Sequence, residues 1–175
     1  MKAIVIYKSK YGATRTYAKW IADSLGCEAA EAKTVSAASL AEYDTIVYGG
    51  GLYAEIISGV NLITKNFDKL SDKKIAVYTT GLTPPDCRDY YENMVNPKNF
   101  KPHMLEKIKV FNFNGKMVVD ELSLVHKTAI KSLKKIMSGK ENPSDMEKLL
   151  IELCYKDGDF TDRAETKELI DYING

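Results

Sequence analysis

The sequence predicts an α/β fold with a five-stranded parallel sheet of strand order 2-1-3-4-5, helices on both faces, and a helical elaboration in the C-terminal third. Two observations predict this class. Short apolar, β-branched runs alternate with segments of helical period through the first hundred residues, which is typical of right-handed strand–helix–strand units. Three of the runs also end in polar, glycine-containing loops, as expected where a ligand binds at the carboxyl edge of an open sheet.

Length and charge limit the function classes. The 175 residues carry a formal net charge of +1, which fits a single domain over 1–175 and argues against a nucleic-acid partner. No apolar run reaches the length of a membrane span, and Lys8 interrupts the N-terminal run, so a cytoplasmic location is expected. The three cysteines and two histidines lack ligand spacing, so no metal site is expected.

The passage from the first strand into the first helix predicts an anion site. Residues 3–7 form an apolar run, and apolar residues at three- and four-residue steps predict a helix over about 14–26. The first N–H groups of a helix lack intrahelical acceptors and favour a phosphate. Gly12 permits close approach, and Ser9 and Thr14 offer hydroxyl groups. The alternative is a plain turn that binds nothing.

Two later strands are expected to end in loops of similar character. Residues 44–48 run into three glycines, 49–51, which are expected to form a loop with positive φ that approaches a ligand closely, and Tyr53 follows with an aromatic ring. Residues 74–80 form the next strand and end at Gly81. Because the carboxyl ends of parallel strands share one edge, the three loops are expected to border one crevice.

The other elements follow in chain order. We expect an edge strand at 27–32, a short helix within 33–42, a helix over 58–70 with Ser58 as N-cap, a helix from 86 that ends before Pro97, a fifth strand at 108–113 with a short continuation at 117–119, and helices over 122–139, 146–153 and 164–173.

Residues 120–160 exceed what a five-stranded fold needs and are therefore an elaboration of the domain. The lysines of this stretch are Lys127, Lys131, Lys134, Lys135 and Lys140. They are expected to form a solvated basic face, or else to make peripheral contact with a membrane surface or an anionic partner through 127–140.

Two common nucleotide motifs are absent. Gly-x-Gly-x-x-Gly does not follow the first strand, and Gly115-Lys116 lacks the other residues of a Walker loop. One phosphate loop, with two further loops able to clasp a flat ring, indicates a mononucleotide cofactor, and FMN is the natural candidate.

Three segments carry a family resemblance: Ser9-Lys10-Tyr11-Gly12-Ala13-Thr14-Arg15, Gly49-Gly50-Gly51-Leu52-Tyr53-Ala54 and Thr79-Thr80-Gly81-Leu82-Thr83-Pro84. They resemble the FMN loops of flavodoxin-like proteins, whose fold is a three-layer sandwich. The sequence is most similar to the branch that includes menaquinone-dependent protoporphyrinogen oxidase, through its Ser-x-x-Gly-x-Thr-Arg loop and the lysine-rich segment 126–139. The resemblance covers most of residues 1–140.

The resemblance implies FMN as cofactor and assigns residues to its two ends. The phosphate loop comprises Ser9, Lys10, Tyr11, Gly12, Ala13 and Thr14, and the isoalloxazine is flanked by Gly50, Gly51, Leu52, Tyr53, Ala54, Thr80, Gly81, Leu82 and Thr83. Tyr53 is the candidate stacking ring. The chain departs from the family pattern at Tyr11, where a small hydroxyl residue is usual, and at Glu55, where glycine is common.

Three functions stay open. The first is an FMN-dependent oxidoreductase that passes reducing equivalents between an organic substrate and a quinone or similar acceptor, with a porphyrinogen suggested by the branch alone. The second is an electron carrier that docks on a redox partner protein, and the third is a flavin-free binding module. Glu55, Asp86, Arg88 and Cys87 lie near the predicted flavin edge, but no catalytic role is assigned to them.

Overall fold

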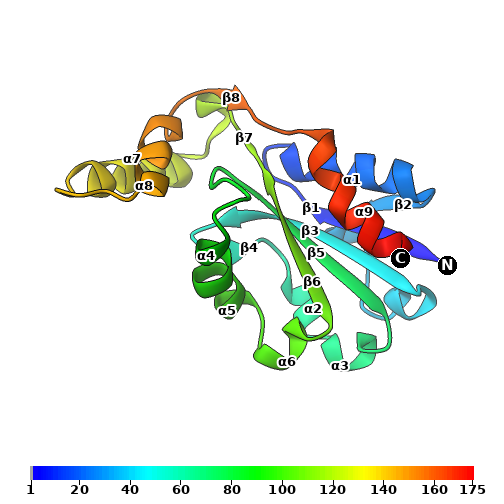
Figure 1. The fold of residues 1–175 in the computed structure, drawn as a ribbon. Helices are drawn as coiled ribbons and strands as arrows, with labels where there is room; N and C mark the ends of the chain where they lie inside the picture. The colour runs from blue at the N-terminus through cyan, green and yellow to red at the C-terminus, as the bar shows by residue number, and fades with distance from the viewer. Residues whose placement is uncertain (1) are drawn as a thin grey trace.

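Five parallel strands form one sheet in a computed structural model that describes residues 2–175 (Figure 1). Their spatial order is β2-β1-β3-β5-β6, which is the predicted order 2-1-3-4-5. A short strand, β4 (Ile56–Ile57), pairs antiparallel with the end of β3. The bounds of the five are β1 Ala3–Lys8, β2 Glu28–Glu31, β3 Thr45–Tyr53, β5 Lys74–Gly81 and β6 Ile108–Asn114.

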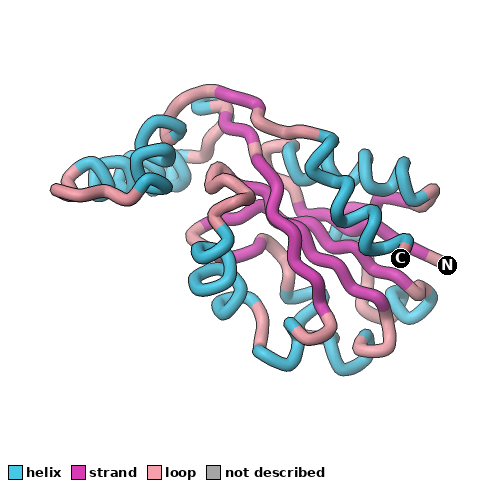
Figure 2. The backbone as a smooth tube through the Cα atoms, viewed as in Figure 1, coloured by secondary structure: helices cyan, strands magenta, loops and turns pink. Residues whose placement is uncertain are grey.

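Helices cover both faces of the sheet, so the predicted three-layer sandwich is confirmed (Figure 2). Successive strand residues point to opposite faces, and each central strand is apolar on both. Ile6 belongs to the core beneath the helical turns of residues 61–105, and its neighbour Val5 belongs to the core beneath α1 (Ala13–Leu25) and α9 (Lys167–Asn174). The sequence shows continuous apolar runs because these strands are buried on both sides.

The first face is covered by short helical turns rather than by the two longer helices expected. The helix predicted over 58–70 is split into α2 and α3, and Ser58 does not cap it. The helix predicted to end before Pro97 continues past it, because Pro97 lies in the first turn of α5, where no N–H is needed. The turns are α2 Asn61–Thr64, α3 Phe67–Leu70, α4 Arg88–Tyr90, a π-helical turn Tyr91–Val95, α5 Asn96–Asn99 and α6 Pro102–Leu105.

The glycines at 49–51 form part of β3 instead of the expected loop. All three are buried in the strand, and positive φ among the described glycines occurs at Gly12, Gly26 and Gly59. Each glycine makes room for protein atoms. A Cβ on Gly49 would lie 2.0 Å from the Tyr78 ring, and one on Gly51 would lie 2.9 Å from the Tyr53 ring. The run therefore serves packing inside the sheet, and the prediction that these glycines form a loop with positive φ was wrong.

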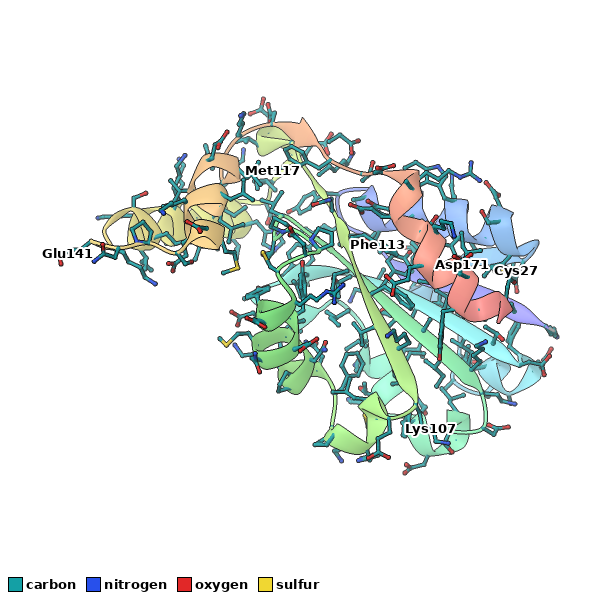
Figure 3. All side chains as sticks on the ribbon, in the orientation of Figure 1. Cys27, Lys107, Phe113, Met117, Glu141 and Asp171 are labelled. Carbon is teal, nitrogen blue, oxygen red and sulfur yellow. The ribbon has the colours of Figure 1, made fainter. Side chains whose placement is uncertain are left out.

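The elaboration projects from the carboxyl edge of the sheet (Figure 1). A two-stranded ribbon, β7 (Lys116–Met117) with β8 (Gly158–Asp159), connects it to the domain, and it consists of α7 (Leu124–Ser138) and α8 (Asp145–Leu153). Its own small core contains Met137, Leu150 and Cys154. Figure 3 shows Glu141 at its tip.

The remaining turns are short 3-10 segments: Ala32–Thr34, Ser39–Glu42, Val119–Glu121 and Arg163–Thr166. Within residues 2–175, no helix is long and apolar enough to cross a membrane.

The packing of Gly49 leads to a test of the fold. Gly49→Ala places a methyl group inside the Tyr78 ring, so we expect a loss of about 1–3 kcal/mol in the free energy of unfolding, measured by denaturant titration. Gly139→Ala is the matched control, because Gly139 has φ −84° and a Cβ there would be no closer than 3.4 Å to its neighbours. Equal stability of the two variants would contradict the packing argument.

Candidate cofactor site

The three loops predicted to meet do meet at the carboxyl edge of the sheet. The first and third are joined by the hydroxyl groups of Thr14 and Thr80, whose oxygens lie 2.8 Å apart. The first and second are joined by Tyr11 and Tyr53, whose ring centroids are 6.4 Å apart in an edge-on arrangement. Parallel pairing brings the loops together, because β1, β3 and β5 are neighbours in register.

The first loop is built to receive an anion. Gly12 has a φ of +96°, and its N–H donates to the Ser9 hydroxyl oxygen at 3.1 Å, which closes the loop. The N–H groups of Ala13, Thr14 and Arg15 begin α1, and within residues 2–175 none of them has a hydrogen-bond acceptor. Three free donors at the positive end of a thirteen-residue helix fit a phosphate.

Thr14 contributes differently from the expectation that its hydroxyl faces the phosphate. The side chain is buried, and its hydroxyl forms a hydrogen bond with the Thr80 hydroxyl. Its backbone carbonyl accepts a hydrogen bond from the Tyr78 hydroxyl at 2.8 Å. Thr14 therefore fixes the start of α1 against β5, and its N–H group is the donor left for a ligand.

An aromatic cluster stands beside the phosphate loop and joins it to α7. The His126 ring stacks on Tyr53 with centroids 4.7 Å apart and planes at 28°. Nδ1 of His126 lies 2.7 Å from the Tyr11 hydroxyl, and the N–H of Ser123 donates to the same hydroxyl at 3.3 Å. Tyr53 is therefore a stacking residue, and its partner here comes from the elaboration.

Lys10 sets the charge balance of this cluster. Burial raises the pKa of Tyr11, but the Ser123 N–H and the positive charge of Lys10 outweigh it, so that the net shift is downward. Burial, and then the same lysine, lower the pKa of His126. Both members of the pair therefore release a proton more readily than usual.

The second loop is a tight hairpin between β3 and β4. Its two turn residues, Ala54 and Glu55, have φ values of +47° and +66°, a conformation that usually requires glycine or asparagine. Asn99 holds the turn, because its side chain donates to the Glu55 carbonyl and accepts the N–H of Ile57. The strain and the external clamp give Tyr53 a fixed position at the site.

The residues assigned to the ring end make different packing contacts. Gly50 and Gly51 are buried, and a Cβ on them would meet the hairpin and the Tyr53 ring, respectively. Leu52 lies against Gly81, and Leu82 packs on the small core of the elaboration. The carbonyl of buried Thr83 accepts the Tyr91 hydroxyl at 2.6 Å. The third loop is thus held by the π-helical turn below and the elaboration above.

The comparisons agree with this arrangement. A family model described as "Flavodoxin domain" matches residues 4–144. The chain belongs to the flavodoxin domain family. No curated protein matches the sequence.

Solved structures similar to this flavodoxin domain are distant in sequence. Oxidised Flavodoxin 2 from Bacillus cereus is 20% identical in sequence and has a TM-score of 0.47. The match covers 65% of this chain and 84% of that chain. A flavodoxin from the domain Archaea has 15% identity, with 88% and 96% covered and a TM-score of 0.40. A flavoprotein in complex with FMN from Lactobacillus acidophilus has 13% identity, with 65% and 91% covered and a TM-score of 0.40.

Sequence reasoning missed four residues of the site in this flavodoxin domain: Ser123 and His126 from the elaboration, Asn99 beneath the hairpin, and Lys116, which lies over Gly12. Each is far from its partner along the chain. One signal was available, since the Ser-Leu-Val-His stretch at 123–126 is an N-cap pattern and His126 is one of only two histidines.

The loop charges considered earlier are mostly engaged elsewhere. Glu55 forms an ion pair with Lys98. Asp86 and Arg88 are exposed, and burial raises the pKa of the Cys87 thiol, which disfavours its reactive thiolate. Nothing in the geometry gives any of them a role in catalysis.

The lysines of the elaboration are likewise partly engaged within the chain. Lys134 donates to the Cys154 carbonyl, Lys131 lies over the Tyr155 ring, and Lys140 pairs with Glu147. α7 also exposes apolar residues, with Leu124 80%, Val125 75% and Ile136 64% exposed. Contact with a membrane surface through the Lys-rich segment 127–140 stays a prediction.

Two hollows border the described residues. A cavity of about 90 Å³ lies beside the phosphate loop, between Lys10, Arg15 and Glu31. A larger one of about 570 Å³ lies at the opposite edge of the sheet, where Lys65 and His103 are among its lining residues. The second lacks the converging loops and free helix donors of the first, so we place the functional site at the carboxyl edge.

The strained hairpin supports a stability prediction. Ala54→Gly removes the Cβ from a residue with φ +47°, and we expect it to raise the free energy of unfolding by up to about 1 kcal/mol. Ala29→Gly, at an exposed strand position, is the control and is expected to lower it by about 0.5–1 kcal/mol. Chemical denaturation measures both. A loss in both variants would show that the turn is unstrained.

The cluster also supports a pH prediction. The lowered pKa of His126 means that the unfolded chain binds this proton more readily, so the contribution to stability is present above the unfolded pKa and lost as pH falls. We expect an NMR titration midpoint for His126 below that of the urea-unfolded chain. Lys10→Ala should raise the midpoint part of the way, because burial remains. His126→Asn assigns the signal, and equal folded and unfolded midpoints would contradict the prediction.

Proposed function

We propose that this flavodoxin domain binds FMN and is an oxidoreductase that passes reducing equivalents between an organic substrate and a quinone or similar acceptor. The observation that carries the proposal is the convergence of three loops on a helix N-terminus with unused N–H donors, beside the ring of Tyr53. Bound FMN would supply the redox chemistry, and the protein would supply binding and orientation.

The phosphate end fits FMN closely. Gly12 leaves room for an anion, and the N–H groups of Ala13, Thr14 and Arg15 are free to bind it. At the ring end, Tyr53 offers an aromatic face, one side of which is occupied by His126. A flavin ring would therefore lie on the other side of Tyr53 or displace His126.

Tyr11 and His126 are the groups that could handle a proton. The Tyr11 oxygen and His126 Nδ1 are 2.7 Å apart, a distance at which the phenol and the imidazole can share a proton. An organic substrate that is dehydrogenated at a C–H bond next to an N–H or O–H group loses a proton as well as hydride, so a proton acceptor at the ring supports an enzyme rather than a carrier.

The elaboration supports the same choice. Through Ser123, His126 and Leu82 it builds a wall on the phosphate and ring loops. A wall of this kind excludes water from a small substrate, whereas a carrier needs an open flavin edge for a partner protein. The near-zero net charge also differs from the strong acidity of carrier flavodoxins. A porphyrinogen substrate is the finer proposal, which rests on the family branch alone.

A turnover assay tests the proposal. The FMN-loaded protein is expected to oxidise a porphyrinogen or another reduced organic substrate with a soluble quinone as acceptor, and Tyr11→Phe is expected to slow turnover by about 100-fold, a modest general acid–base effect. Tyr43→Phe, at the far edge of the sheet, is the control. An absorption spectrum and FMN titration come first, since a protein that ignores FMN would refute both redox functions and leave a binding module.

The carrier alternative gives a different result in the same assay. A carrier would exchange electrons rapidly with a redox protein such as a flavodoxin reductase and slowly with quinones, and Tyr11→Phe would leave both rates unchanged. That outcome would overturn the enzyme proposal while keeping FMN binding.

A further inference from the structure

Lys116 lies over the phosphate loop, although it is more than a hundred residues away in the sequence. A Cβ built on Gly12 would be 3.2 Å from both Cε and Nζ of Lys116. The ammonium group thus lies next to Gly12, the residue directly before the free N–H groups of α1. The lysine is half-buried, so its charge is less screened than that of a surface lysine.

This ammonium has no acceptor within the chain. Across residues 2–175, no carboxylate lies within ion-pair distance of Lys116 and no hydrogen bond involves its side chain. The opposite residue in the β7–β8 ribbon is Asp159, a natural partner. Its carboxylate instead accepts from the N–H and hydroxyl of Thr161.

The Glu165 carboxylate, which contacts Asn114 two residues before Lys116, is occupied too. Glu165 accepts the N–H of Asn114 at 2.9 Å and the hydroxyl of Tyr17 at 2.5 Å. The half-buried ammonium of Lys116 is therefore left available for an anion from outside the chain.

The backbone around Lys116 is fixed, so its position is built in. The N–H of Gly115 donates to the Gly81 carbonyl at 2.6 Å, and the Gly115 carbonyl accepts the N–H of Phe160 at 3.1 Å. A Cβ on Gly115 would lie 3.0 Å from the Gly81 oxygen, so glycine is needed for this approach. The third loop and the ribbon thereby aim the next side chain toward Gly12.

The other cations near the loop are placed less well. Lys10 is exposed, and its ammonium lies near the Ser123 hydroxyl at 3.4 Å and over the Tyr11 ring. Arg15 is exposed on the first turn of α1. Lys116 instead reaches the loop from the β7–β8 ribbon and lies beside Gly12.

We infer that Lys116 is the cationic ligand of the phosphate group in this site, and that it selects a phosphorylated flavin over an unphosphorylated one. The inference rests on the proposed FMN binding and deepens it. The α1 donors alone bind a phosphate through neutral groups, whereas Lys116 adds a charge-assisted contact with a dianion. Its contribution is absent for riboflavin, which has the same ring and no phosphate.

The test compares FMN and riboflavin on the same variants. We expect Lys116→Ala and Lys116→Gln to weaken FMN binding by about 10- to 100-fold, the range for a charge-assisted contact, and to leave riboflavin affinity unchanged. Lys116→Arg should keep most of the affinity for FMN. Flavin fluorescence titration measures the dissociation constants, and a salt series should give a shallower slope for the Ala variant than for the native protein.

Lys107→Ala is the matched control, because it removes the same charge from an exposed residue just before β6, at the opposite end of the β6–β7 segment from Met117 (Figure 3). If Lys116→Ala and Lys107→Ala leave FMN affinity equal to that of the native protein, the inference is overturned and FMN binding stands. If both flavins lose affinity together in the Gln variant, the lysine supports the fold instead. A native protein that binds neither flavin would overturn the proposed function itself.

Discussion

Parallel pairing of β1, β3 and β5 is the constraint on which the site depends. In register, these strands deliver three loops to one edge of the sheet, and buried contacts such as the Thr14–Thr80 hydroxyl pair lock the loops to one another. Burial on both faces leaves the strands no freedom to slip, because a shift by one residue would exchange the two cores. The pairing of the strands and the contact between Thr14 and Thr80 therefore hold the free N–H donors of α1 in place.

The Tyr11 hydroxyl transmits this rigidity to the elaboration. It accepts the Ser123 N–H at the start of α7 and meets His126 one turn later, so the phosphate loop and the projecting segment share one polar contact. A small hydroxyl residue at this position would be too short to reach either partner. The departure from the usual family pattern at Tyr11 thus has a structural consequence, because the Tyr11 side chain connects the phosphate loop to the elaboration.

The sequence predicted what depends on local pattern. The strand order and the two-sided burial followed from apolar runs, and the structure contains both. The turn at Gly12, which has a positive φ, followed from glycine placement. The sequence could not predict what depends on distant packing. Glycines 49–51 proved to accommodate Tyr78 and Tyr53 inside β3, and the 58–70 helix broke into turns because several short segments share one face of the sheet. Asn99 and Lys116 carry no local signal, since each acquires its role from a residue at least 40 positions away, and the N-cap pattern before His126 does not reveal its distant partners Tyr11 and Tyr53.

The selectivity that we propose for the site depends on the part of the chain that the core fold does not require. The sheet and α1 provide an anion cradle and a place for a ring, features that a flavodoxin domain needs in any function. Residues beyond β6 provide the imidazole on Tyr53 and the ammonium over Gly12, and they pack on Leu82 in the third loop. These contacts would bind a charged ligand group, position a proton and limit the access of water. Such properties determine which reaction a flavin protein carries out. Specific chemistry can therefore change through the C-terminal third while the sheet stays the same.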